Sequence, residues 1–89
     1  MGDYKVLFKP SVEKDLQRLP KTTVARAMGR MEALGDNPFP PACAKLSASE
    51  RLYRIRVGDY RIVYEVDSQV GVVTIHHVRH RREVYRRLR

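Results

Sequence analysis

Hydrophobic residues in the N-terminal half of the chain follow first a strand pattern and then a helical one. Residues 4–9, Tyr-Lys-Val-Leu-Phe-Lys, are rich in strand formers and end at Pro10, so we expect a first strand there. Apolar residues then recur at i, i+4 and i+7, the spacing of one helical face, at Val12, Leu16 and Leu19. We expect Ser11 to cap this helix, because a serine hydroxyl can accept a hydrogen bond from an early backbone N–H.

A second helical stripe covers residues 21–34, and its apolar side chains share one face: Val24, Ala27, Met28, Met31 and Leu34. Pro20 ends the first helix or begins the second, and Gly35 with the following Asn37-Pro38 is a natural stop. We expect the two helices to form an antiparallel hairpin that packs its shared apolar face on a sheet. An alternative, in which the Met and Leu stripe forms a partner-binding groove, is less favoured than a role in the core.

Three further strands are predicted in the second half of the chain, at residues 52–57, 60–66 and 72–78. The proline-rich segment 36–43 is predicted to be a loop. Gly58 and Asp59 form a two-residue connection with glycine in the first central place, as a type II′ hairpin prefers. Residues 67–71 should form a longer hairpin loop, and residues 81–89 a terminal helical turn or two or a frayed tail.

The predicted order is β-α-α-β-β-β, which corresponds to an α+β fold. A helical hairpin should pack on one face of a small, mostly antiparallel sheet, followed by a short basic C-terminal tail or helix. With 89 residues, the chain is expected to form a single domain, 1–89, around one modest core.

The two-residue turn fixes which residues of the central hairpin lie opposite each other. Counting outward pairs Val57 with Tyr60, Arg56 with Arg61, Ile55 with Ile62, Arg54 with Val63 and Tyr53 with Tyr64. Side chains alternate between faces, so one face is apolar and aromatic and must pack under the helices: Tyr53, Ile55, Val57, Tyr60, Ile62, Tyr64 and Val66. The other face carries Arg54, Arg56 and Arg61, with only Glu65 near its far end for compensation.

Arg56 opposite Arg61 is a like-charge pair, which costs on the order of 0.2–1 kcal/mol of stability. The arrangement is explained if an anion, above all a phosphate, normally binds there. Arginines on an exposed sheet face are also common as solvated surface, and their stems can cover apolar neighbours. Three guanidinium groups converging from two paired strands favour the binding interpretation.

Net charge supports a polyanionic partner. The chain has 18 Lys and Arg against 10 Asp and Glu, a formal net charge of +8. All the basic residues after position 45 are arginines, whose planar guanidinium grips phosphate in a bidentate way that lysine cannot. Nucleic acid, a phosphate-bearing ligand or an acidic protein is therefore the expected partner, and a merely soluble basic surface is the alternative.

The sequence disfavours several other classes of protein. No apolar run approaches the roughly 18 residues of a membrane span, and the N-terminus has no signal-peptide stretch, so we expect a cytoplasmic protein with no membrane partner. The lone Cys43 excludes an internal disulfide framework and is expected to be a small thiol in or near the core. His76, His77 and His80 lack a Cys or acidic ligand at suitable spacing, and His76 and His77 should point to opposite faces of a regular strand; no metal site is expected.

No nucleophile–base pair, glycine-rich phosphate loop or acidic magnesium cluster is evident in the sequence, and no cofactor is expected. An enzyme acting on a polyphosphate must then use arginine, tyrosine and histidine. That repertoire suits cleavage of RNA by its own 2′-hydroxyl, because the protein need only orient the nucleophile, neutralise the phosphorane and transfer protons. Tyr85, among several arginines, could stack on a nucleobase, and a solvated basic end with Tyr85 against the core is an equal alternative.

Five motifs, in order along nearly the whole chain, resemble the RelE branch of the RelE/ParE superfamily of bacterial and archaeal toxins. They are KPSVEKDLQRLP at 9–20, ALGDNPFPP at 33–41, KL at 45–46, YRIRVGDYRIVYEV at 53–66 and VRHRREVYR at 78–86. The central motif is highly specific, whereas the helical ones are weak individually. The resemblance implies the RelE/ParE-like, microbial ribonuclease-like fold.

The resemblance also implies a function and partners. Such toxins are ribosome-dependent, metal-independent endoribonucleases that cut mRNA in the A site of the 30S subunit, leaving a 2′,3′-cyclic phosphate and a 5′-hydroxyl. A RelB-like antitoxin is the implied protein partner, and operator DNA is bound only through the complex with that antitoxin.

Residue roles carry over by position in these motifs. Arg54 and Arg56 match strand positions where well-studied members have basic residues, one of them proposed as the general base. Arg61 matches the arginine that stabilises the transition state, Arg81 the residue proposed to protonate the leaving oxygen, and Tyr85 the tyrosine that stacks on or orients the substrate. Further contacts with RNA are expected from Lys45, Arg79, His80, Arg82 and Arg86.

Arginine at both 54 and 56 departs from the family pattern, and it is a poor proton acceptor, because a guanidinium stays protonated in proteins. Either another group takes the proton, with His80 and Glu83 as candidates, or the step is mostly electrostatic.

Two other functions stay open. A ParE-type toxin of the same fold inhibits DNA gyrase by protein binding without nuclease activity, and it would not need the arginine face or Tyr85. A degenerate toxin retained for operator binding with its antitoxin would be non-catalytic, and the intact basic set argues against it.

Overall fold

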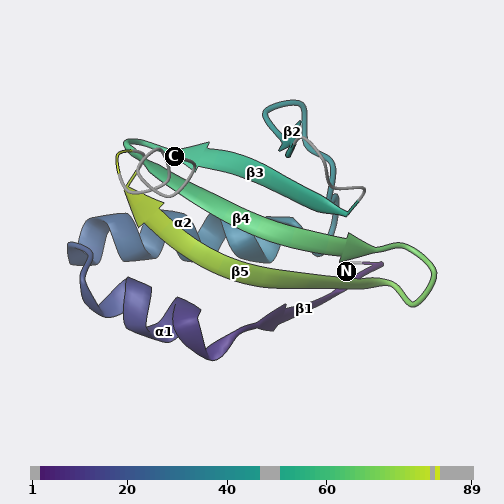
Figure 1. Ribbon diagram of the computed structural model, residues 1–89, viewed down its shortest axis with the longest axis horizontal. Helices are drawn as coiled ribbons and strands as arrows, with labels where there is room; N and C mark the ends of the chain where they lie inside the picture. The colour runs from purple at the N-terminus through teal and green to yellow at the C-terminus, as the bar shows by residue number, and fades with distance from the viewer. Residues whose placement is uncertain (1–2, 47–50, 81, 83–89) are drawn as a thin grey trace.

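The computed structural model describes residues 3–46, 51–80 and 82 (Figure 1). In chain order its elements are β1 (Lys5–Phe8), α1 (Pro10–Gln17), α2 (Lys21–Ala33), β2 (Ala44–Lys45), β3 (Leu52–Val57), β4 (Tyr60–Asp67) and β5 (Val72–His80). Helix α2 crosses behind the long strands and α1 lies along β5 (Figure 1). The predicted α+β fold, a helical hairpin on a mostly antiparallel sheet, is confirmed.

The strand order in the sheet is β1-β5-β4-β3-β2, so the first strand of the chain lies beside the last. β1 pairs with β5 in parallel, and the other described pairs are antiparallel. The core between helices and sheet contains residues of both helical stripes and of the predicted apolar strand face, among them Val12, Met31, Leu34, Ile55, Ile62 and Tyr64. Both stripes therefore belong to the core, as predicted.

The sequence pattern does not predict β2. Its two residues, Ala44 and Lys45, pair with Arg54 and Tyr53 of β3. A segment of two residues is too short to show the alternation that identifies a strand, so only the tertiary pairing reveals it.

Helix α1 satisfies the edge of β5 where β1 no longer reaches it. β1 pairs only with residues 72–75 of β5. Beyond them, the Ser11 hydroxyl donates a hydrogen bond of 2.8 Å to the carbonyl of His76, and the backbone N–H of Val78 donates one of 3.0 Å to Oδ2 of Asp15. Because buried backbone groups need partners, these two side chains replace the hydrogen bonds that a neighbouring strand would form.

The predicted N-cap role of Ser11 is wrong. The N-cap residue of α1 is Lys9, which makes no side-chain capping bond, and Pro10 occupies the first turn. Proline suits this position because its φ is already helical and the missing N–H would have no intrahelical partner. Ser11 consequently lies inside the helix, and its hydroxyl is available to β5.

Gly35 stops α2 near the predicted place but for a different reason. Its φ is not in the left-handed region, which among the described glycines is occupied by Gly58 and Gly71. Instead, the Gly35 carbonyl accepts a 3.0 Å hydrogen bond from the N–H of Tyr4, and a Cβ at Gly35 would lie 3.2 Å from the Tyr4 carbonyl oxygen. The glycine is needed because the chain leading into β1 passes so closely.

Tyr64 fastens the proline-rich loop to the sheet. Its hydroxyl is buried and donates a 2.8 Å hydrogen bond to the carbonyl of Pro38, and its ring stacks on Tyr53 with centroids 5.9 Å apart. Burial, with a smaller contribution from neighbouring Cys43, raises the pKa of Tyr64 well above its ordinary value. The hydroxyl therefore stays protonated and keeps donating to the loop.

The edge contact at Val78 predicts a difference between two substitutions of Asp15. Asp15→Ala should lower the free energy of unfolding by about 1–3 kcal/mol, because the Val78 N–H loses its acceptor. Asp15→Asn keeps a side-chain oxygen as acceptor for this N–H, so its free energy of unfolding should fall clearly less. Urea denaturation of the two variants measures both free energies. Equal decreases would show that α1 does not stabilise β5 through this hydrogen-bond acceptor.

Candidate nucleic-acid interface

The β3–β4 hairpin forms in the predicted register. Gly58 has a φ of 59° and opens the turn in a conformation that glycine adopts without strain. Arg56 lies opposite Arg61, and Ile55 opposite Ile62. Because these pairs alternate between faces, the hairpin places its arginines on the sheet face turned away from the helices.

Strand β5 adds a third arginine to this pair. Arg79 lies opposite Arg61 in the β4–β5 ladder, while Arg56 lies opposite Arg61 in the β3–β4 ladder. Residues in register share a face, so Arg56, Arg61 and Arg79 form a line across three strands. We call this line the arginine row. A second line, one step along the strands, consists of Arg54, Val63 and His77.

Exposure to solvent differs among the arginines of this face. Arg56 is exposed and Arg54 is half-buried, but only 8% of Arg61 is exposed. Arg61 is on the central strand of the three, where side chains of both neighbouring strands can cover it. Arg56 is therefore the open end of the row, and Arg61 is its buried centre.

Asp15 of α1 is the carboxylate that approaches the row at Arg79. Its Oδ2 lies 3.8 Å from Nε of Arg79, beyond hydrogen-bond distance, and already accepts the N–H of Val78. Nη1 of Arg79 is buried and has no hydrogen-bond partner within the described part of the chain. The contact with Asp15 therefore compensates the charge of Arg79 only in part.

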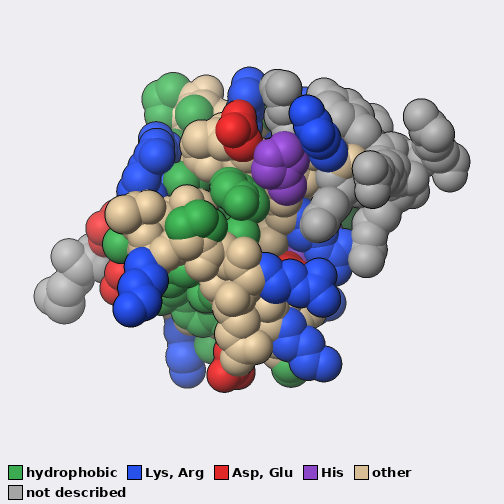
Figure 2. Space-filling view, turned by 90° about the vertical axis from the view of Figure 1, so that its left-hand side faces the viewer, with side chains coloured by type: hydrophobic (Ala, Val, Ile, Leu, Met, Phe, Trp, Pro, Cys, Tyr) green, Lys and Arg blue, Asp and Glu red, His purple; other side chains and the backbone are tan. Residues whose placement is uncertain are grey.

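A small cavity adjoins the end of β5. It has a volume of about 100 Å³ and is lined by residues of both layers, among them Asp15, Arg18, Tyr60, Arg79 and His80. Figure 2 views this end of the molecule and shows Lys and Arg side chains spread around it, with fewer acidic ones between them. Basic side chains therefore outnumber acidic ones on the described part of this face.

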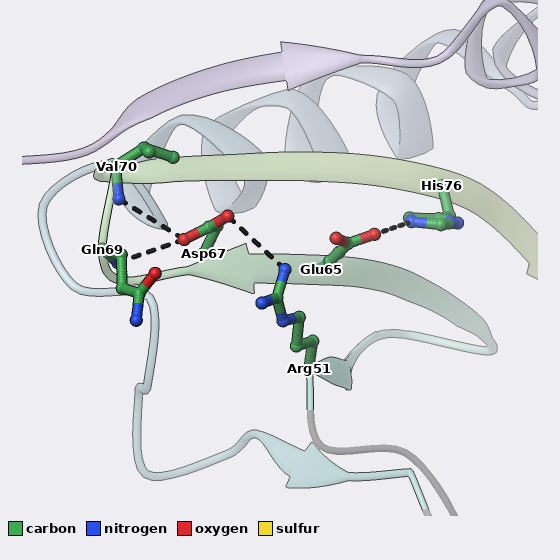
Figure 3. Close-up of polar contacts among 6 residues, drawn as sticks. All are labelled: Arg51, Glu65, Asp67, Gln69, Val70 and His76. Carbon is green, nitrogen blue, oxygen red and sulfur yellow. Dashed lines mark hydrogen bonds and ion pairs between the residues drawn. The ribbon is translucent and has the colours of Figure 1, made fainter.

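A bulge in β5 corrects the predicted orientation of two histidines. Val63 pairs with His77 but Tyr64 pairs with Ile75, so His76 is an extra residue without a cross-strand partner in the ladder. The strand is therefore not regular, and His76 and His77 do not point to opposite faces. His77 shares the face of Val63, and Nε2 of His76 lies 3.1 Å from Oε1 of Glu65 on the same side of the sheet (Figure 3).

Glu65 does not compensate the arginines as its position in the sequence suggests. Its carboxylate contacts His76, and the nearby carboxylate of Asp67 contacts Arg51 over 3.5 Å and the backbone N–H groups of Gln69 and Val70 (Figure 3). The carboxylates of Glu65 and Asp67 therefore contact other groups at the far end of the face and not the arginine row.

Two predicted RNA contacts lie on the other face. Lys45 pairs with Tyr53, and His80 pairs with Tyr60, whose ring lies edge-on to the imidazole at 5.4 Å. Tyr53 and Tyr60 pack against the core, so the structure does not bring Lys45 or His80 to the arginine row. Arg82 is exposed. The predictions for Arg81, Glu83, Tyr85 and Arg86 fall outside the described residues.

Sequence reasoning missed Asp15 and His77 as members of this site. Asp15 has a recognisable signal, because it falls three residues after Val12 and four before Leu19, on the apolar stripe of α1. His77 has none, since its face depends on a bulge that no sequence pattern marks.

Among residues 3–46, 51–80 and 82, no cluster of three or more His, Cys, Asp or Glu side chains is arranged to hold a metal ion. Neither α1 nor α2, the helices in that part of the chain, is long and apolar enough to cross a membrane.

Comparison with known proteins identifies the family. The family model of the ParE toxin of type II toxin–antitoxin systems, parDE, matches residues 6–85. The chain is 33% identical over 84 residues to Toxin RelE of Mycobacterium tuberculosis, covering 93% of this chain and 87% of that protein. The chain is a RelE-type toxin of the RelE/ParE superfamily. Toxin RelG of the same organism is 31% identical to this toxin, over 94% of this chain and 98% of RelG.

A solved structure agrees with this assignment. The crystal structure of the archaeal RelE–RelB complex from Pyrococcus horikoshii OT3 contains a chain that matches this toxin with a TM-score of 0.79 and 33% sequence identity. The match covers 89% of this chain and 96% of that one. The resemblance that the sequence motifs indicate is confirmed.

Repulsion within the arginine row predicts that the free toxin gains stability when one charge is removed. Arg56→Gln should raise the free energy of unfolding by about 0.2–1 kcal/mol, because Arg56 faces Arg61 directly. Added salt should stabilise the unmodified toxin more than the variant, since salt screens the same repulsion.

The control is Arg51→Gln, which removes an equal charge from the ion pair with Asp67, just before β3. It should leave the toxin unchanged or slightly less stable. Thermal denaturation at low and high salt measures all three proteins, and destabilisation by Arg56→Gln would contradict the repulsion.

Proposed function

We propose that this toxin is a ribosome-dependent, metal-independent endoribonuclease that cuts mRNA in the A site of the 30S subunit, through attack of the 2′-hydroxyl on the adjacent phosphate. The arginine row is the observation that supports it: three guanidinium groups from three neighbouring strands share one face. The similarity to Toxin RelE of Mycobacterium tuberculosis supports the same class of activity.

The arginine row suits the chemistry of this reaction. The equatorial oxygens of the phosphorane carry more negative charge than those of the starting phosphodiester. Cations that are already in place therefore stabilise the transition state more than the bound substrate, which lowers the barrier. The free toxin tolerates the repulsion of these cations, with Asp15 compensating Arg79 only in part.

In the proposed site, Arg61 contacts the phosphorane from the middle of the row, and Arg54, Arg56 and Arg79 hold the surrounding backbone. Arg81 protonates the leaving 5′ oxygen, Tyr85 stacks on or orients the substrate, and Arg82 and Arg86 extend the contacts with RNA. Lys45 and His80 lie on the other face, so any contact that they make with RNA is away from the reacting phosphate.

Mapping of 5′ ends in cellular mRNA tests the activity. Induced expression should produce new 5′-hydroxyl ends within translated codons, and these should disappear when translation is blocked. Arg61→Gln should reduce cleavage by about 10²–10³-fold, because a charge aimed at the transition state is lost. The matched control, Arg51→Gln, removes the same charge far from the row and should cleave normally. Cuts on naked RNA would contradict ribosome dependence.

We further propose an antitoxin as the protein partner, with operator DNA bound only through the complex. One structural relative is a complex of RelE with RelB. Carboxylates of such a partner would neutralise the arginine row, and an apolar segment would cover exposed side chains such as Leu7 and Phe8.

Co-expression of the cognate antitoxin should abolish growth arrest, and the purified complex should unfold at a higher temperature than the free toxin. An unchanged unfolding temperature would contradict the pairing.

Inhibition of DNA gyrase is the second candidate, because the matching family model is that of ParE. In that case induction would stabilise gyrase–DNA cleavage complexes, and no new mRNA ends would form. The Arg61→Gln variant would then stay toxic.

A further inference from the structure

The proposed reaction needs a group that removes the proton from the 2′-hydroxyl, and the arginine row cannot provide it. A guanidinium stays protonated at any physiological pH. Arg54 and Arg56 are therefore confined to electrostatic roles. The proton acceptor must be another side chain that lies on the same face and titrates near neutral pH.

Histidine is the side chain whose ordinary titration range fits this task. The three histidines of the chain have different positions in the described sheet. His80 pairs with Tyr60 and lies on the helix side. His76 is held by Glu65 in the bulge, farther from the row. His77 lies opposite Val63, in the line next to the arginine row.

The position of His77 brings its ring within reach of a phosphate bound at the row. On one strand face, residues two apart are separated by about 7 Å. Arg79 is two residues from His77 on β5, and Arg61 is two residues from Val63 on β4. Val63 between them is small, apolar and buried, so no long polar side chain of β4 stands between the imidazole and a phosphate on Arg61.

We propose that His77 is the general base of the cleavage reaction, an inference that rests on the proposed endoribonuclease function. The imidazole accepts the proton of the 2′-hydroxyl while the 2′ oxygen forms a bond to phosphorus. The bond from phosphorus to the 5′ oxygen breaks, and that oxygen leaves with the electron pair and takes a proton from the proposed donor, Arg81, which regains one from water; the products are a 2′,3′-cyclic phosphate and a 5′-hydroxyl. The proton on His77 then passes to water.

The charged surroundings of His77 suit a base. Arg54 on β3, Arg61 on β4 and Arg79 on β5 flank it, with Glu65 and His76 toward the bulge. Asp15 of α1 is the acidic group on the helix side, where its carboxylate is shared between the N–H of Val78 and Arg79. Neighbouring positive charges favour the neutral form of an imidazole, which is the form that accepts a proton. The bulge at His76 is what places His77 here, because a regular strand would put residue 77 under the helices with Val73 and Ile75.

The test is the pH dependence of single-turnover cleavage of ribosome-bound mRNA, from about pH 5 to about pH 9. The unmodified toxin should lose activity toward acid pH as the imidazole becomes protonated. His77→Gln should be about 10²–10⁴-fold slower at neutral pH and should lack this acid limb. The matched control, His76→Gln, removes the neighbouring histidine and should keep both the rate, within about threefold, and the acid limb.

A second variant distinguishes loss of the general base from a structural effect of the substitution. His77→Ala should regain activity when imidazole is added to the reaction, whereas Arg61→Gln should not. The inference is overturned if His77→Gln keeps the acid limb, or if it is slow and the alanine variant gains nothing from imidazole. Failure of the unmodified toxin to cleave would instead overturn the proposed function, and the inference with it.

Discussion

The two-residue turn at Gly58 and Asp59 leaves β3 and β4 a single register, and that register sets Arg56 opposite Arg61. A shift by one residue would turn Ile55 and Ile62 to the outside and empty the core, so the like-charge pair cannot relax by slipping. The ladder with β5 then adds Arg79 to the same line. A cationic site is thus held in place by the hydrophobic free energy of the opposite face, which outweighs the repulsion among the guanidinium groups.

Helix α1 connects the fold with this site. Ser11 and Asp15 supply hydrogen bonds to the edge of β5 beyond the end of β1, and this support keeps the last residues of β5 in the sheet. The same carboxylate that accepts the N–H of Val78 lies 3.8 Å from the guanidinium of Arg79. One acidic side chain on the apolar stripe of a helix therefore both stabilises the edge and partly compensates the arginine row.

The bulge at His76 puts each later residue of β5 on the opposite face of the sheet from the one it would occupy in a regular strand. It keeps Val78 in the core while moving His77 and Arg79 to the arginine face. In a regular strand Arg61 would lie opposite Val78, so the chain would have two arginines in register instead of three, and His76 rather than His77 would lie opposite Val63. The carboxylate of Glu65, the acid of β4 on this face that lies nearest to the bulge, contacts His76 and not the arginines.

The sequence by itself determined the helical hairpin, the three long strands and the hairpin register, because these depend on local periodicity and on one short turn. It also placed Arg54, Arg56 and Arg61 on one face. Only the tertiary structure decided that Arg61 is buried, that Ser11 and Asp15 complete the edge of β5, and that His77 rather than His80 lies beside the arginine row. These features depend on which strand neighbours which and on a single extra residue in β5, and neither leaves a pattern in the sequence.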